Sequence, residues 1–371
     1  MIYADNAATT KLDPDAFTAM KPYLMEEYGN ASQPYRFSKS ARVAIKNARE
    51  VVAECIGAVP EEIYFTSCGT ESDNTVIKSV LFDDKAKKVV TSSIEHHAIL
   101  NSCHSIEKLG VPVEYLEVDK TGIVRPEDLS SKIDSDVSLV SIMMANNEIG
   151  TIEPIRELCQ VAHSKGALFH TDAVQAAGHI HIDVKELGVD MLSASAHKFN
   201  GMKGSGFLFV KRGTPLHAFM DGGAQEQGKR AGTENVAAIV AMAVALKKNC
   251  NRIDETTNRL HHFENVFLQR LNDANIDFIR NGNERHLPGN INISIRHTEG
   301  EMLLHRLDLK GICISTGSAC DSVNTQISHV IRAIHVPDDY AKGTIRISLG
   351  WENTEDEVIT MADELIKILQ R

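Results

Sequence analysis

The feature that most constrains the fold is an alternation of short apolar runs with helical stretches between residues 38 and 210. Helical patterns lie at Thr70–Leu81 and Pro154–Lys165, and another runs to about Cys55 with Ser38 as its expected cap. Buried strands that alternate with helices predict an α/β fold with a mostly parallel sheet flanked by helices. The runs that predict strands are Ile63–Thr66, Lys88–Ser92, Val113–Val118, Val137–Ala145, Ala167–Thr171 and Gly206–Val210.

The pattern changes after a long helical region, from about Thr233 to Leu271 with a break near Asn251. Beyond it, strand-like and helical segments mix, and 371 residues are too many for one small core. We therefore expect a large domain at 12–254 and a smaller α+β domain formed by 1–11 and 255–371. The segments of the smaller domain are strands at Ile291–Ile295, Gly311–Ile314 and Thr344–Leu349, and helices at Gly300–Leu309 and Thr354–Gln370, the last with a capping box of Thr354 and Glu357.

Charge and cysteine usage exclude several classes of protein. The formal net charge is −11, which disfavours nucleic acid or an anionic membrane as the main partner. The first ten residues lack the pattern of a signal peptide, and the longest apolar run, Val236–Leu246, is too short to span a membrane. Seven cysteines without a C-x-x-C pair argue against a disulfide framework or a thiolate zinc site, and for the cytoplasm.

Polar residues that could carry chemistry follow predicted strands, where sites of open α/β sheets lie. After the first predicted strand, Gly69 permits a tight turn. Thr70 could cap the next helix, and the free backbone N–H groups at the start of that helix could bind a phosphate. A plain strand–helix turn is the alternative, because Glu71 and Asp73 would oppose an anion. Further on, Asp172 closes an apolar strand, where a carboxylate is costly unless a positive group meets it or it caps a helix.

Two other strand ends carry a lysine and a cysteine. Lys198 follows Ser195 and His197 and precedes a glycine-rich stretch, which is an unusual place for a structural lysine. Cys320 lies in the polar segment from Ser315 to Ser322, a context typical of a reactive thiolate, although a spare surface thiol is the alternative.

An acid, a lysine, a phosphate turn and a histidine are together the protein groups that pyridoxal phosphate needs. The chain also resembles, over essentially its whole length, the class V, fold-type-I enzymes that use this cofactor, specifically the NifS/IscS-type cysteine desulfurases. The matching stretches, in the order of the family, are Tyr3–Thr10, Gly69–Asn74, Glu95–His96, Asn146–Gly150, Asp172–Gln175, Ala196–Lys198, Arg230–Asn235, Gly317–Cys320 and Ile345–Ser348.

The resemblance implies a role for each matching residue. Lys198 would hold the cofactor covalently and remove the substrate α-proton, Asp172 would pair with the ring nitrogen, and His96 would stack on the ring and transfer protons. Arg346 would bind the substrate carboxylate, unless it is simply an exposed strand arginine. The remaining implied contacts are Gly69, Thr70, Ser195 and His197 with the phosphate, Thr233 with the phosphate from a second subunit, Asn147 with the substrate side, and Gln175 with the ring hydroxyl.

The implied reaction converts L-cysteine to L-alanine and leaves the sulfur on Cys320 as a persulfide. An acceptor protein would then take the sulfur for iron–sulfur cluster assembly or for thiolation of tRNA or cofactors, and Cys320 could also ligate a cluster transiently. The resemblance also implies a homodimer. Two alternatives stay open: another class V enzyme, such as a selenocysteine lyase or an aminotransferase, and a non-enzymatic protein that has kept the fold.

Four positions depart from the usual pattern of the family: Tyr35, Asp221, Gln227 and Ile327. None of them removes a chemical group that the mechanism requires. The histidine pairs at 96–97, 179–181 and 261–262 predict no metal site, because no acid or cysteine joins them at a helpful spacing.

Overall fold

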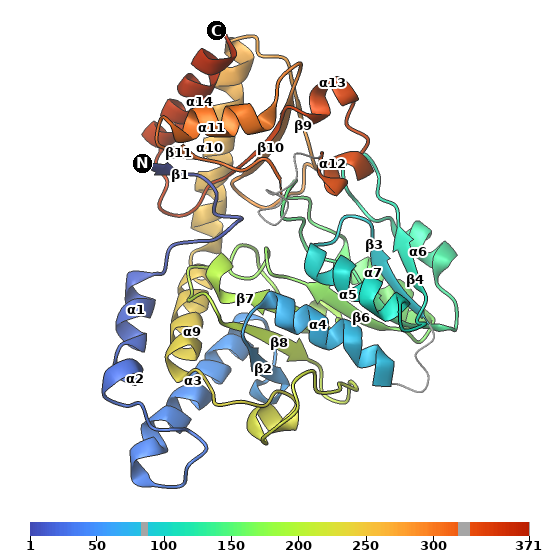
Figure 1. The fold of residues 1–371 in the computed structure, drawn as a ribbon, viewed down its shortest axis with the longest axis vertical. Coiled ribbons are helices and arrows are strands. Elements are labelled where there is room, and N and C mark those ends of the chain that lie inside the picture. The colour runs from blue at the N-terminus through green and yellow to red at the C-terminus, as the bar shows by residue number, and fades with distance from the viewer. Residues whose placement is uncertain (83–87, 318–326, 371) are drawn as a thin grey trace.

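The computed structural model describes residues 1–82, 88–317 and 327–370, so Cys320 lies outside the described residues (Figure 1). Its centre is a seven-stranded sheet in which all strands are parallel except β8, which is antiparallel to both of its neighbours. The predicted α/β class with a mostly parallel sheet is thereby confirmed. In sheet order the strands are β2 (Ile63–Thr66), β8 (Gly206–Val210), β7 (Met191–Ser195), β6 (Leu168–Asp172), β5 (Val137–Ser141), β3 (Lys88–Ser92) and β4 (Val113–Leu116).

Helices cover both faces of this sheet because successive strand residues point to opposite faces. On one face, α4 (Gly69–Ser79) and α5 (His97–Glu107) pack on a core that includes Val89 and Leu139. On the other face, the adjacent residues Val90 and Val140 join a core with α3 (Lys39–Cys55), α7 (Ile155–Ser164) and α9 (Val236–Cys250). Shorter helices complete this part of the chain: α1 (Pro14–Met20), α2 (Pro22–Met25), α6 (Pro126–Lys132) and α8 (Val184–Leu187). Within the described ranges, no helix is both long and apolar enough to cross a lipid bilayer.

The C-terminal part of the chain builds a separate hydrophobic core beside the large sheet (Figure 1). The first strand of the chain, β1 (Ile2–Tyr3), joins this part by pairing in parallel with β11 (Ile312–Cys313). The predicted division between residues 254 and 255 falls in the first turn of α10 and remains a prediction. The other elements are an antiparallel sheet of β12 (Thr344–Ser348), β10 (Asn290–Ile295) and β9 (Phe278–Arg280), with α10 (Ile253–Asp273), α11 (Gly300–Asp308), α12 (His329–Ala333), α13 (Asp338–Ala341) and α14 (Glu355–Leu369).

Three predicted helix starts have different outcomes. The capping box is confirmed, because Thr354 and Glu357 bond reciprocally at the start of α14. Ser38 precedes α3 as predicted, but its side chain makes no capping hydrogen bond. The predicted cap at Thr70 is wrong, since α4 begins at Gly69. Its start is stabilised by the Glu71 carboxylate, which accepts a hydrogen bond from the Ser67 N–H at 2.8 Å.

The fold predicts a large stability effect at Phe169, a fully buried residue in the central strand β6. Phe169→Ala should lower the free energy of unfolding by about 3–5 kcal/mol, because a large cavity would remain in a close-packed core. Chemical denaturation would measure this change. Phe82→Ala is the matched control, since Phe82 is 61% exposed; an equal loss in both variants would contradict the argument.

Candidate active site

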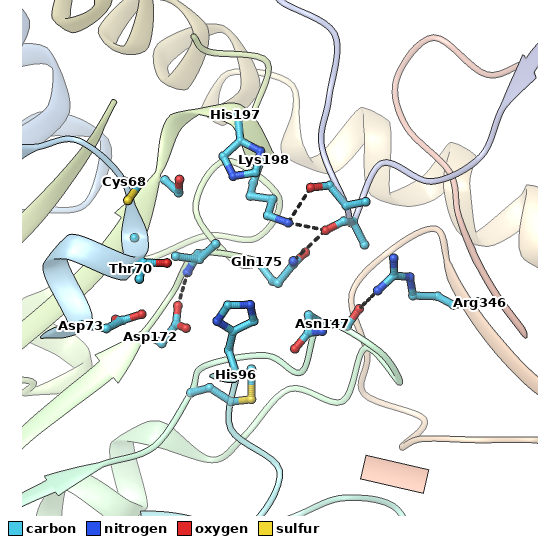
Figure 2. Close-up of a pocket in the computed structure, with 16 residues that line it drawn as sticks. Cys68, Thr70, Asp73, His96, Asn147, Asp172, Gln175, His197, Lys198 and Arg346 are labelled. Carbon is cyan, nitrogen blue, oxygen red and sulfur yellow. Dashed lines mark hydrogen bonds between the residues drawn. The ribbon is translucent and has the colours of Figure 1, made fainter. Parts of the chain in front are cut away.

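The candidate active site lies at the carboxyl edge of the large sheet, where the parallel strands end together. Asp172 ends β6, Ser195 ends β7, and His96 follows β3. These residues line one open cavity of ≈ 220 Å³, into which Arg346 enters from β12 (Figure 2). The topology therefore brings residues that are far apart in the sequence to one place.

Most of the predicted site residues line this cavity. Thr233 is not among the described residues that line it; it is exposed in the loop before α9. Cys320 lies outside the described residues. The predicted residues found in the lining are Gly69, Thr70, His96, Asn147, Asp172, Gln175, Ser195, His197, Lys198 and Arg346.

Several residues that line the cavity had no predicted role: Ala7, Ala8, Cys68, Met143 and Val174. The backbone carbonyls of Ala7 and Ala8 matter most, because they accept hydrogen bonds from site side chains. The signal that could have found them was the match of the N-terminal stretch Tyr3–Thr10, which had no role attached.

Lys198 and Asp172 reach the cavity from neighbouring strand ends (Figure 2). The Lys198 Nζ donates hydrogen bonds to the carbonyls of Ala8, at 2.9 Å, and of Ala7. Asp172 is 4% exposed and accepts a hydrogen bond from the Val174 N–H at 2.8 Å. Burial raises the pKa of Asp172 to about 6, although the Val174 N–H and Lys198 act in the opposite direction. A cationic N–H donor placed beside this carboxylate would favour its charged form.

Two histidines of the cavity have defined hydrogen bonds. His96 is the N-cap of α5, and its Nδ1 accepts a hydrogen bond from the Ala98 N–H at 3.1 Å. In the neutral ring the proton is then on Nε2. His197 contacts the Thr9 hydroxyl through Nδ1 at 3.1 Å. Burial, followed by the charges of Lys198 and Lys203, lowers the pKa of His197 to about 4, so this ring is neutral at neutral pH.

The turn before α4 has the properties of an anion site. Gly69 lies so close to Val174 that a Cβ would approach the Val174 Cγ2 to 2.4 Å, and the first N–H groups of α4 follow directly. The charge of Glu71, which the sequence suggested would repel an anion, is matched by Arg230 at 2.8 Å. Burial and the neighbouring Asp172 raise the pKa of Asp73 well above its usual value, which favours its uncharged form beside the turn.

Arg346 is buried, which excludes the alternative of an exposed strand arginine. Its Nη1 donates to the Asn147 carbonyl at 2.9 Å, and its Nη2 donates to Asp5 Oδ1 at 2.7 Å. Its Nε finds no hydrogen-bond partner among the described residues. A buried guanidinium with an unused N–H that lines a cavity is suited to bind a carboxylate.

Glu95, the residue before His96, predicts a measurable pH effect. Its Oε1 accepts hydrogen bonds from the Ser92 hydroxyl at 2.7 Å and the Met143 N–H at 2.9 Å, and burial raises its pKa to about 8. The folded protein therefore holds this proton more tightly than the unfolded chain, so the contribution of Glu95 to stability falls as the pH rises from about 5 to 8. Glu95→Gln should remove this dependence.

The measurement is the free energy of unfolding of the wild type and the variant across that pH range. We expect Glu95→Gln to gain stability relative to the wild type by roughly 1 kcal/mol per pH unit. The exposed Glu352→Gln should show a constant difference from the wild type. If the free energy of unfolding of Glu95→Gln also differed from that of the wild type by a constant amount, the buried Glu95 carboxyl would not be protonated in the folded protein.

One histidine cluster does have an acid partner, contrary to the expectation from spacing. The His261 Nδ1 and the Glu264 Oε1 are 3.3 Å apart, and the His286 Nε2 lies 2.7 Å from the Glu264 Oε2. Glu264 lies one turn after His261 on α10, and folding adds His286 from a loop 22 residues further along the chain, while the expected absence of a metal stays a prediction. An Arg280 nitrogen contacts Glu264 at 2.8 Å and His286 at 2.7 Å, so a guanidinium supplies the positive charge of this cluster.

Comparisons with known proteins agree with one another. The family model for aminotransferase class-V matches residues 2–361. A protein named cysteine desulfurase IscS from Dictyoglomus turgidum is 47% identical over 100% of this chain and 95% of its own length. A solved structure titled NifS-like protein has a TM-score of 0.94 at 36% identity, covering 100% of this chain and 99% of its own. Another, titled SspA in complex with cysteine, has a TM-score of 0.84 at 33% identity, covering 94% and 99%.

Proposed function

The chain belongs to the aminotransferase class-V family, and we propose that it acts there as a pyridoxal-phosphate-dependent cysteine desulfurase. It is an enzyme of the cysteine desulfurase type, as its full-length similarity to proteins of that name supports. The reaction takes L-cysteine and the thiol of Cys320 and gives L-alanine and a persulfide on Cys320. The C–S bond of the substrate is broken, and an S–S bond to Cys320 is formed.

The observation that carries this proposal is the presence of Lys198 and Asp172 in one cavity. The residues present fit pyridoxal phosphate. Asp172 is a buried acid suited to a ring N–H, and the glycine at 69 keeps side chains out of the turn that would receive the phosphate. Gln175, whose Nε2 donates to the Ala7 carbonyl at 3.0 Å, would contact the ring hydroxyl. Thr70, Ser195 and His197 would complete the phosphate site.

When bound, the cofactor supplies an electron sink for the substrate α-carbon. The chain supplies the proton transfers. Lys198 is a flexible amine in the cavity and can accept the α-proton once its Nζ leaves the carbonyls of Ala7 and Ala8. His96 is suited to give or take a proton at Nε2, because its Nδ1 is engaged with the Ala98 N–H.

Arg346 and Asn147 would select the substrate by its α-carboxylate. The buried guanidinium and its unpartnered Nε support this role, and the Asn147 carbonyl orients Nη1. Both groups come from the edge of the cavity that Figure 2 shows opposite Asp172.

Cys320 is proposed as the sulfur acceptor on the basis of the sequence, since it lies outside the described residues. The persulfide sulfur would pass to an acceptor protein of iron–sulfur cluster assembly or of tRNA or cofactor thiolation. We place these steps in the cytoplasm, where thiols stay reduced.

A homodimer is proposed because the stretch from α1 to the start of α3 exposes many large apolar side chains. Met25 is 75% exposed and Tyr28 is 70% exposed, which is unusual for a surface that stays in water. The exposed Thr233 could then reach the phosphate site of the second copy. The apolar residues of this surface are Phe17, Leu24, Met25, Tyr28, Tyr35, Phe37 and Val43.

The proposed function is tested by incubating the purified protein with L-cysteine and a thiol reductant. We expect alanine and sulfide to form in equal amounts. Formation of 3-mercaptopyruvate, with transfer of the amino group to an added 2-oxo acid, would instead indicate an aminotransferase, and turnover restricted to L-selenocysteine would indicate a selenocysteine lyase. A protein without cofactor absorbance and without turnover would indicate that only the fold has been kept.

A further inference from the structure

The N-terminal turn at residues 5–10 connects both halves of the candidate site. Its Asp5 contacts Arg346 of β12, while the carbonyls of Ala7 and Ala8 accept hydrogen bonds from Lys198. The turn is held in place by backbone and side-chain bonds that do not use the Asp5 carboxylate. The Asn6 N–H donates to the Ser348 carbonyl at 3.1 Å, and the Ala7 N–H donates to the Ser348 hydroxyl at 2.9 Å. The Asp5 side chain is therefore not needed to anchor this turn.

Asp5 and Arg346 form an unequal ion pair. The side chain of Arg346 is 1% exposed, whereas that of Asp5 is 18% exposed, and Asp5 Oδ1 lies 2.7 Å from Nη2. A buried guanidinium is costly without a negative partner, so Asp5 stabilises Arg346 while the substrate is absent. An incoming α-carboxylate brings a second negative charge to the same guanidinium. The two carboxylates then repel each other, and Asp5 is the one that can turn toward water.

We propose that Asp5 sets the affinity of the site for carboxylate ligands, by holding Arg346 in the empty site and opposing the α-carboxylate of the bound amino acid. This inference rests on the proposed function, because it takes Arg346 as the group that binds the substrate carboxylate. This opposition would help the enzyme to release its product, because L-alanine carries the same carboxylate as L-cysteine. A site without Asp5 would retain both more tightly.

The test uses the cofactor-loaded enzyme and two ligands that differ only in the carboxylate. L-Alanine carries it, and ethylamine lacks it. Calorimetry would give the dissociation constant of each ligand for the wild type, Asp5→Asn, Arg346→Gln and Glu352→Gln. Asparagine can still accept a hydrogen bond from Nη2 but carries no charge. Glu352→Gln is the matched control, because it removes a charge near Lys11 of the same N-terminal segment without touching Arg346.

We expect Asp5→Asn to bind L-alanine about tenfold more tightly, which corresponds to ~1.4 kcal/mol, and to leave ethylamine unchanged. Glu352→Gln should change neither ligand, and Arg346→Gln should lose the preference for L-alanine over ethylamine.

Three results would overturn the inference about Asp5. An unchanged or weakened affinity of Asp5→Asn for L-alanine would show that the carboxylate does not oppose the ligand. An equal change for both ligands would show a general structural effect. A preference for L-alanine that survives Arg346→Gln would remove Arg346 from the carboxylate site, and with it the substrate contact of the proposed function. A loss of preference in Arg346→Gln alone would leave the proposed function in place and reject only the role of Asp5.

Discussion

Lys198→Ala is expected to yield a protein that no longer holds the cofactor covalently and that turns over L-cysteine about 10³-fold more slowly or worse. The physical reason is that the Lys198 amine lies in the same cavity as Asp172. The carbonyls of Ala7 and Ala8 hold it there. Borohydride reduction followed by mass spectrometry would measure the attachment. The wild type should retain the mass of the cofactor on Lys198, and the variant should retain none.

Lys203→Ala is the matched control for this experiment. Lys203 is five residues away, is exposed, and does not appear among the described residues that line the cavity. This variant should retain the cofactor and full turnover. Covalent attachment that survives Lys198→Ala would show that another amine binds the cofactor. The proposal that Lys198 and Asp172 act on the same cofactor would then be rejected.

Cys320→Ala is expected to abolish the transfer of sulfur to the protein. Mass spectrometry after exposure to L-cysteine should show one added sulfur on Cys320 of the wild type and none on the variant. Sulfide release should also fall by about 10²-fold or more, because water and free thiols replace a positioned nucleophile poorly.

Cys68 and Cys313 provide the controls for the cysteine experiment. Cys68 lines the cavity, and Cys313 lies in β11. Cys68→Ala and Cys313→Ala should both retain the added sulfur on Cys320. Sulfur on either of these cysteines would move the nucleophile and keep the enzyme class, whereas full turnover of Cys320→Ala without any persulfide would reject the desulfurase mechanism.

Strong local patterns were sufficient to predict most elements of the fold. The apolar run at residues 88–92 and the helical break near Asn251 both appear in the structure, at β3 and between α9 and α10. A strand was expected before Lys198, but the bounds of β7 were not predicted, because its residues from Ser193 to Ser195 are small and partly polar. The extent of such a strand becomes clear only when its neighbours in the sheet are known. The cap at Thr70 failed because the Glu71 carboxylate accepts a hydrogen bond from the Ser67 N–H at the start of that helix.

The candidate site was predictable where one residue at a strand end is chemically unusual. Asp172 and Lys198 stand out because a carboxylate after an apolar strand and a lysine among small residues both need an explanation. The cluster of His261, Glu264 and His286 was missed, because only folding brings the loop of His286 to α10. The contact of Asp5 with Arg346 was missed for the same reason, since 341 residues separate the two in sequence.

The sequence by itself determined the alternation of strands and helices, the residues at the strand ends and the resemblance to a family, because each depends on neighbours in the chain. Tertiary structure alone decided the raised pKa values of Glu95 and Asp73, the burial of Arg346 and the position of the N-terminal turn between Lys198 and β12. These properties depend on removal from water and on charges brought close by folding. The physical reason is that desolvation and Coulomb energies are functions of distance in space, and a one-dimensional pattern does not contain those distances.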